Sequence, residues 1–258
     1  MEIHLLRNAT MRLRYAQHTL LADPDLAPRH ARDSFTGRSR NPMVDLPLAK
    51  EAIVEGIEAV LVSHLHADHF DAEAQQLLPK DIPVFCQPTD AERIQGYGFR
   101  NVIPVDHVVE WQGVRITRVA GQHGFGADLA SMGQVSGFVL AAAHEPTLYW
   151  VGDSVWYPDV AATIEQFQPS VIVTHSSGAI WEAGTPIVMD AQQTITLCQT
   201  ATASTVVAIH LDSLDHGQVS RADLRMAASA AGISAAQLRI PNDGDVLSFE
   251  GSSAVASQ

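Results

Sequence analysis

Three histidines and one aspartate lie within six consecutive residues of this sequence. They are His64, His66, Asp68 and His69, directly after the β-branched run 57–63. Such a run predicts a buried strand, and side chains two residues apart on an extended chain point to the same side, so His64 and His66 can hold one ion. Asp68 and His69 follow where the chain turns, so their side chains are expected to point toward a second position beside the ion that His64 and His66 can hold. Nitrogen and oxygen donors at this spacing predict a metal site and suit two divalent ions.

Single polar residues follow three other predicted strands. They are His123, Asp153 and His210. The ends of buried strands are where α/β proteins assemble their sites, and glycines close to His123 let the backbone approach a ligand closely. An isolated histidine after a strand is more often an ordinary loop residue, but a site that starts from the first motif needs further ligands. We therefore predict that all three residues bind metal.

Four more side chains are candidates for contacting a substrate or for supporting the metal ligands. His175 directly follows another predicted strand, and His216 follows the last metal candidate by six residues. For these two, a hydrogen-bonded loop histidine is the alternative interpretation. Arg38 and Arg40 lie in the polar stretch 26–47, which predicts a loop of the length typical of active-site lids. Their guanidinium groups could clamp a carboxylate or phosphate, although exposed arginines are usually only solvated.

The elements that must position these residues alternate between strands and helices. A hairpin is predicted within 2–23. Further strands are predicted at 57–63, 82–86, 101–105, 114–120, 136–142, 148–151, 170–174 and 204–209, and helices at 70–78, 91–96, 161–167, 190–202 and 220–231. This alternation is typical of α/β proteins, and no repeat or linker divides the chain. We predict one α/β domain over 1–258.

The overall charge excludes several classes of partner. The chain has 16 Lys and Arg against 29 Asp and Glu, a net charge of −13, which disfavours binding to nucleic acid or to an anionic membrane surface. Two cysteines make no disulfide framework. No apolar run is long enough for a membrane span or a signal peptide. We expect a cytoplasmic protein that acts on a small molecule, and the sequence neither requires nor excludes a homo-oligomer.

The seven metal candidates, in their order and spacing, resemble the metallo-β-lactamase-fold superfamily. That resemblance implies a four-layer αββα sandwich with two ions at one edge of the sheets. It assigns His64, His66 and His123 to the first ion, and Asp68, His69 and His210 to the second, with Asp153 bridging them. Within the superfamily the chain is most similar to the branch of L-ascorbate-6-phosphate lactonase. The residues that carry this similarity are Asn8–Thr10, Asp23-Pro24, Gly178 and Met189–Ala191.

The resemblance implies a hydrolase that attacks with a metal-bound hydroxide. The expected substrate is small and anionic, a lactone or cyclic ester, and Asp68 could also carry a proton during the reaction. Zinc or manganese is expected, and iron is allowed by the same donors. Neither cysteine matches the second-site cysteine of class B β-lactamases. Two alternatives stay open, a phosphodiesterase and an iron-dependent redox enzyme similar to persulfide dioxygenase.

Overall fold

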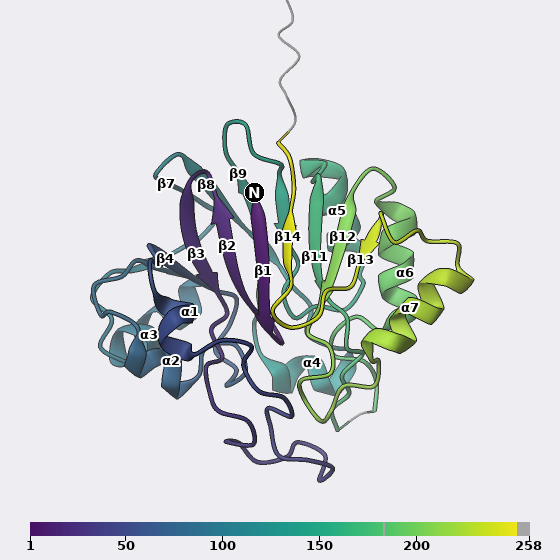
Figure 1. The fold of residues 1–258 in the computed structure, drawn as a ribbon, viewed down its shortest axis with the longest axis horizontal. Helices are drawn as coiled ribbons and strands as arrows, with labels where there is room; N and C mark the ends of the chain where they lie inside the picture. Colours follow the sequence, from purple (N-terminus) through teal and green to yellow (C-terminus); the bar gives the residue numbers. More distant parts are fainter. Residues whose placement is uncertain (183, 252–258) are drawn as a thin grey trace, which may run out of the picture.

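Two seven-stranded sheets face each other in the computed structural model, which describes residues 1–182 and 184–251 (Figure 1). The first sheet has the order β14-β1-β2-β3-β4-β5-β6, and the second has the order β13-β12-β11-β10-β9-β8-β7. The strands of the first sheet are β1 (Glu2–Arg7), β2 (Thr10–Tyr15), β3 (His18–Ala22), β4 (Ala59–Val62), β5 (Val84–Cys86), β6 (Val102–Pro104) and β14 (Val246–Ser248). Those of the second are β7 (Val108–Trp111), β8 (Val114–Ala120), β9 (Ser136–Ala141), β10 (Leu148–Trp150), β11 (Val171–His175), β12 (Thr205–Ile209) and β13 (Leu238–Arg239).

Helices cover the outer faces of both sheets (Figure 1). On the first sheet lie α1 (Lys50–Val54), α2 (Ala72–Leu77), the 3₁₀ helix η1 (Pro88–Asp90) and α3 (Ala91–Gly96). On the second lie α5 (Pro158–Phe167), α6 (Ala191–Thr200) and α7 (Arg221–Ala230), while α4 (Gly126–Met132) lies at the lower edge in Figure 1. The predicted four-layer αββα sandwich is therefore confirmed. Among the residues described, no helix is long and apolar enough to cross a membrane.

The main hydrophobic core lies between the two sheets. Met11, Leu13 and Tyr15 of β2 are buried in it, while the arginines between them point away, as the period of two in a strand dictates. Trp150 of β10 enters the same core from the opposite sheet and is 1% exposed. The Tyr15 hydroxyl donates to the Leu140 carbonyl at 3.0 Å, so it also ties the two sheets together.

The structure has more elements at its edges than the sequence predicts. The segment 2–23 was predicted as a hairpin but forms the three strands β1, β2 and β3. Strands β7, β13 and β14 and helices α1 and α4 have no counterpart in the prediction, because each is too short for a clear periodicity. The predicted helix over 70–78 is observed as α2, and the Asp71 side chain caps it by accepting from the Ala74 amide.

Parallel strand ends bring the candidate residues to one edge of the sandwich. β10, β11 and β12 are parallel, and Asp153, His175 and His210 lie at or just beyond their carboxyl ends. His64 follows β4 by two residues in the facing sheet. The long loop 26–47 and α4 lie at this same edge, at the bottom of Figure 1.

Candidate metal centre

Six histidines and one aspartate form two adjacent groups at this edge. The first group is His64, His66 and His123, and the second is His69, Asp153, His175 and His210. Within each group the nearest ligand atoms all lie within 4.8 Å of one another. The rings of His64 and His69 have centroids 4.1 Å apart, so the two groups touch. The structure thus brings the predicted histidines and Asp153 together into two neighbouring clusters of possible ligands.

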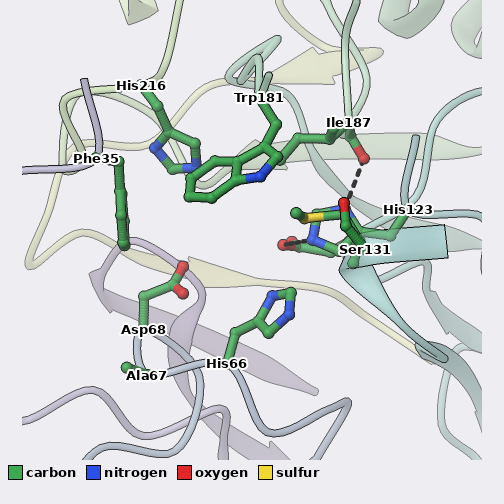
Figure 2. A pocket seen from close by; sticks show the side chains of 11 residues that line it. Phe35, His66, Ala67, Asp68, His123, Ser131, Trp181, Ile187 and His216 are labelled. Atoms are coloured by element: carbon green, nitrogen blue, oxygen red, sulfur yellow. Dashed lines mark hydrogen bonds and ion pairs between the residues drawn. The ribbon is translucent and has the colours of Figure 1, made fainter. Parts of the chain in front are cut away.

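A cavity of about 420 Å³ opens onto both groups (Figure 2). Its polar lining beside the metal candidates is formed by His66, Asp68, His123 and Asp153. His216 and Trp181 lie across the cavity from His66 and Asp68. Phe35, Met132 and Ile187 add further apolar surface to the lining. No lysine or arginine is among the described residues that line this cavity. A molecule bound there meets the metal candidates on one side and an aromatic, uncharged wall on the other.

The Asp153 carboxylate lies between the two groups. Its Oδ2 is 3.2 Å from His69 Nε2 in the second group and 3.4 Å from His123 Nε2 in the first. Its Oδ1 is 3.7 Å from His210 Nε2. One carboxylate thus reaches donors of both groups, which is the geometry required of a ligand that two ions share.

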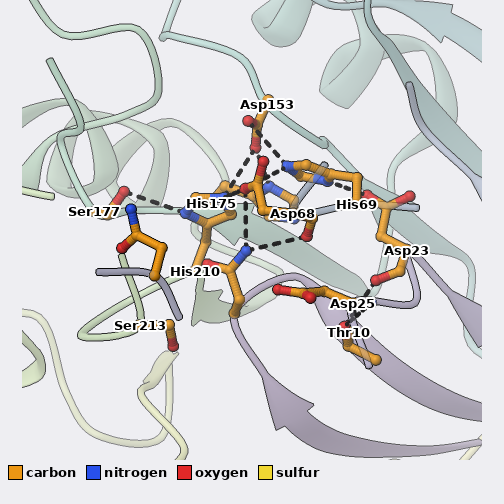
Figure 3. A network of polar contacts seen from close by, with 12 residues as sticks. Thr10, Asp23, Asp25, Asp68, His69, Asp153, His175, Ser177, His210 and Ser213 are labelled. Atoms are coloured by element: carbon orange, nitrogen blue, oxygen red, sulfur yellow. Dashed lines mark hydrogen bonds and ion pairs between the residues drawn. The ribbon is translucent and has the colours of Figure 1, made fainter. Parts of the chain in front are cut away.

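Asp68 contacts two histidines of the second group (Figure 3) and also lines the cavity (Figure 2). Its Oδ2 lies 3.2 Å from His69 Nε2 and 3.3 Å from His210 Nε2. Asn8, in the left-handed conformation with φ of 56°, donates its side-chain amide to the same oxygen at 3.2 Å. Asp68 can therefore hold the second ion and is also accessible to a substrate.

Hydrogen bonds at the far ring nitrogen orient the histidines. His123 Nδ1 donates to the Ile187 carbonyl at 2.7 Å, and because a carbonyl only accepts, the Nε2 of a neutral ring keeps its lone pair. His210 Nδ1 contacts the Ser177 hydroxyl at 3.3 Å. In both residues Nε2 is left to face the centre. Fixing the outer nitrogen in this way is how proteins orient a histidine that binds metal.

Asp23 orients two more histidines and is a residue that sequence reasoning missed. Its Oδ2 accepts from His69 Nδ1 at 2.6 Å and from the Ser63 hydroxyl at 2.6 Å. Since that hydroxyl proton goes to Asp23, Ser63 accepts from His64 Nδ1 at 3.0 Å. The Asp23-Pro24-Asp25 segment has the composition of a turn, and nothing in its local spacing indicates that Asp23 contacts a motif more than 40 residues away.

The donor set fits divalent cations. His64 Nε2 is buried at the centre and has no hydrogen-bond partner among the described residues. A buried polar atom in that state is costly unless something binds it. Neutral imidazole and carboxylate donors together suit zinc, manganese or iron.

Burial and charge set the proton affinities of the centre. Burial lowers the pKa of His123 to about 4, so this ring is neutral and able to bind metal at physiological pH. Burial alone would lower the pKa of His69, but the charges of Asp153 and Asp68 outweigh it and raise that pKa well above its usual value. In the metal-free protein His69 is thus protonated on both ring nitrogens and positively charged, close to the carboxylates of Asp153 and Asp68. A bound cation would supply that positive charge instead.

The other candidate residues are placed differently. His216 lines the cavity, and His175 lies behind Asp153 and does not. Arg38 and Arg40 are not among the lining residues: Arg38 Nε donates to the Thr36 hydroxyl and Arg40 Nε to the His30 carbonyl. Their guanidinium groups serve the loop itself, so the expectation that they clamp a substrate gains no support from the geometry.

The long loop contributes Phe35, which the sequence did not single out. The Phe35 ring meets the rings of His216 and Trp181 edge-on, at centroid distances of 4.9 and 5.9 Å. Asp215 anchors this part of the loop, because its carboxylate accepts from the Phe35 amide at 3.1 Å and from the Asn41 side chain at 2.8 Å. Ser34 and Thr36 donate to the same carboxylate. Asp215 thus holds the loop between residues 34 and 41, and this places Phe35 in the lining of the cavity.

Replacing Asp215 by alanine is expected to release this loop. Arg38 and Arg40 then become accessible to trypsin, and cleavage there should be at least about tenfold faster than in the parent protein. Limited proteolysis followed by mass spectrometry measures it. Asp212→Ala is the matched control, since Asp212 pairs with Arg221 and makes no contact with the loop that the structure records. Equal cleavage rates in parent and Asp215→Ala would show that this carboxylate is not the anchor.

Comparison with known proteins gives consistent likenesses over most of the chain. Residues 18–211 match the family described as "Beta-lactamase superfamily domain". The UPF0173 protein YddR of Bacillus subtilis (strain 168) is 32% identical over 255 residues, covering 96% of this chain and 100% of that protein. The crystal structure of "a possible metal-dependent hydrolase" from Veillonella parvula DSM 2008 has a TM-score of 0.93 at 32% identity, covering 96% and 99% of the two chains. That of an isothiocyanate hydrolase from Delia radicum gut bacteria has a TM-score of 0.92 at 33% identity, covering 97% and 100%.

Proposed function

Because the chain belongs to the beta-lactamase superfamily and, within it, to the UPF0173 metal-dependent hydrolases, we propose that it hydrolyses small uncharged electrophiles, with isothiocyanates as the first candidate. The observation that carries this proposal is the cavity, which faces both ligand groups and has apolar walls without a cationic side chain among its described residues. Because no lysine or arginine is among the described lining residues, the wall favours an uncharged organic group over the anionic substrate that the sequence suggested.

The residues take the following roles in the proposal. His64, His66 and His123 hold one ion, and His69, His210 and Asp68 hold the other, with Asp153 shared. Bound zinc or manganese would supply hydroxide at neutral pH and polarise the electrophile, and iron remains an alternative metal. Asp68 faces the cavity and can move a proton between the attacking water and the leaving group. His216 lies on the opposite side, where its ring can hydrogen-bond the substrate.

An isothiocyanate matches the two sides of the cavity. Its central carbon is electrophilic, it carries no charge, and its organic group can pack on Phe35 and Trp181. The oxygen of water would add to that carbon and a proton would pass to nitrogen. Cleavage of the carbon–nitrogen bond, with a second proton to nitrogen, then gives a primary amine and carbonyl sulfide. A relative that is 33% identical over nearly the whole chain is named an isothiocyanate hydrolase, and this supports the choice.

A lactone or cyclic ester is the second candidate. It is also uncharged and electrophilic at carbon, so the same apolar wall would accept it. A phosphodiester brings a negative charge that no lining lysine or arginine of the described residues would meet. The iron-dependent redox alternative rests only on the tolerance of the histidine and aspartate donors for iron.

The test compares these substrates on one preparation of the full chain. Protein reconstituted with zinc or manganese is assayed for amine release from benzyl isothiocyanate, beside a γ-lactone and a chromogenic phosphodiester, with elemental analysis of the bound metal. We expect kcat/KM for the isothiocyanate to exceed the others by about 100-fold or more. Faster lactone turnover would favour the second candidate, and phosphodiester turnover or thiol-dependent oxygen consumption would overturn the proposal.

Phe35→Ala is expected to affect bulky substrates selectively. Loss of the ring removes roughly 1 kcal/mol of aromatic contact, so KM for benzyl isothiocyanate should rise about fivefold while kcat changes little. Methyl isothiocyanate is too small to use the same contact, and its KM should stay within about twofold. Steady-state kinetics on both substrates measures the difference. Phe125→Ala is the control, because Phe125 is exposed and does not line the cavity. Equal changes for both substrates would contradict this role.

A further inference from the structure

His175 contacts the shared carboxylate and not the cavity. It is the last residue of β11 and is 1% exposed. Its Nδ1 lies 2.5 Å from Asp153 Oδ1 (Figure 3), and its Nε2 lies 3.1 Å from the indole nitrogen of Trp150. Both ring nitrogens therefore have a partner within the protein.

The chemistry of those partners fixes where the proton of His175 sits. An indole nitrogen can only donate, so His175 Nε2 must accept and has no proton. In the neutral ring the proton is then on Nδ1, which donates to Asp153 Oδ1. Although His175 lies close enough to the other members of the second group to be counted among possible ligands, Nδ1 carries a proton and the lone pair of Nε2 accepts from Trp150, so neither nitrogen is free for an ion.

This hydrogen bond determines which oxygen of Asp153 faces the two groups. Oδ1 is held by His175, so Oδ2 is turned to His69 and His123, at 3.2 and 3.4 Å. Trp150 is itself fixed in the core between the sheets, 1% exposed and stacked on Phe138 with an interplanar angle of 29°. The orientation of the carboxylate is thereby linked to the rigid core.

We propose that Trp150 and His175 are positioning residues that orient Asp153 so that one of its oxygens is shared by two ions. The inference rests on the proposed two-ion site, and it goes further by giving His175 a role other than metal ligand or substrate contact. Hydrogen-bond partners behind metal ligands commonly change metal affinity by about 10- to 100-fold when removed. We call the two hydrogen bonds from Trp150 to His175 and from His175 to Asp153 the relay. Loss of either bond should therefore change metal affinity itself and not only turnover.

The experiment measures zinc affinity and stoichiometry with a competing chelator, together with the absorption spectrum of the cobalt-loaded protein. Trp150→Phe keeps an aromatic ring but removes the indole donor, and His175→Leu removes both ring nitrogens. Each should weaken binding of one ion about 10- to 100-fold. His175→Asn should restore affinity to within about threefold, because its amide can donate to Asp153 from nearly the position of Nδ1. Trp111→Phe, at a partly buried tryptophan packed beside Phe85 and His18, is the matched control and should bind as the parent does.

Each outcome separates the relay from the alternatives. Parent-like affinity in both Trp150→Phe and His175→Leu overturns the proposal. Weak binding in His175→Leu and His175→Asn with parent-like binding in Trp150→Phe shows instead that His175 is a ligand. If circular dichroism shows that Trp150→Phe is unfolded, the comparison of His175→Leu with His175→Asn decides alone. A parent protein that binds fewer than two ions contradicts the proposed function, and the relay is then judged on the ion that remains.

Discussion

Replacing Asp153 by asparagine is expected to lower hydrolase turnover about a thousandfold or more and to reduce the metal content by at least one ion per chain. The amide has nearly the same shape as the carboxylate but no negative charge. Oδ2 of Asp153 lies within 3.4 Å of donors from both groups, so both ions would lose a charged ligand at once. His175 would also face an amide in place of a carboxylate, which disturbs the orientation of the side chain.

Elemental analysis and turnover of the best substrate on the same preparation measure this effect. Asp106→Asn is the matched control, because that carboxylate is 78% exposed and lies away from the centre. It should leave metal content and turnover within about twofold of the parent values. If Asp153→Asn retained two ions and parent turnover, the shared-ligand role of this residue would be wrong.

Local spacing was enough to select most of the residues that the structure brings together at this edge. The motif from His64 to His69 follows a buried strand, and the structure places its donors in two touching groups. His123, Asp153 and His210 were predicted from strand ends, and they meet because the strands that precede them end at one edge of the sandwich. The position of a side chain can be predicted in this way where a single strand is enough to determine it.

Contacts between distant segments could not be predicted in the same way. Asp23 acts on His69 across 46 residues, and Asp215 holds Phe35 across 180. Neither pair has a signal within its own segment. The role of His175 depends on Trp150 in the neighbouring strand, and only the pairing of β10 with β11 brings the two rings together. Arg38 and Arg40 show the opposite case, in which residue type suggested a role that the loop geometry does not support.

Removal of metal is expected to lower the melting temperature of the protein by about 10 °C or more. Ions that bind only the folded state at a thousandfold excess over Kd stabilise it by about 4 kcal/mol per site. One kcal/mol corresponds to roughly 2–4 °C in a chain of this size. The structure supplies a physical reason, since a metal-free centre leaves His64 Nε2 buried without a hydrogen-bond partner among the described residues.

Thermal unfolding with and without a chelator, followed by return of zinc, measures this shift. The same cycle on Asp153→Asn tests where the stabilisation comes from: if both ions act through the shared carboxylate, zinc should raise the melting temperature of this variant by half the parent shift or less. An equal shift in the two proteins would mean that the ions bind without Asp153. No shift in the parent would mean that the centre does not bind zinc under the conditions used, and manganese and iron would then be tested by the same cycle. The comparison links metal content to folding through one carboxylate, and it does so without knowledge of the substrate.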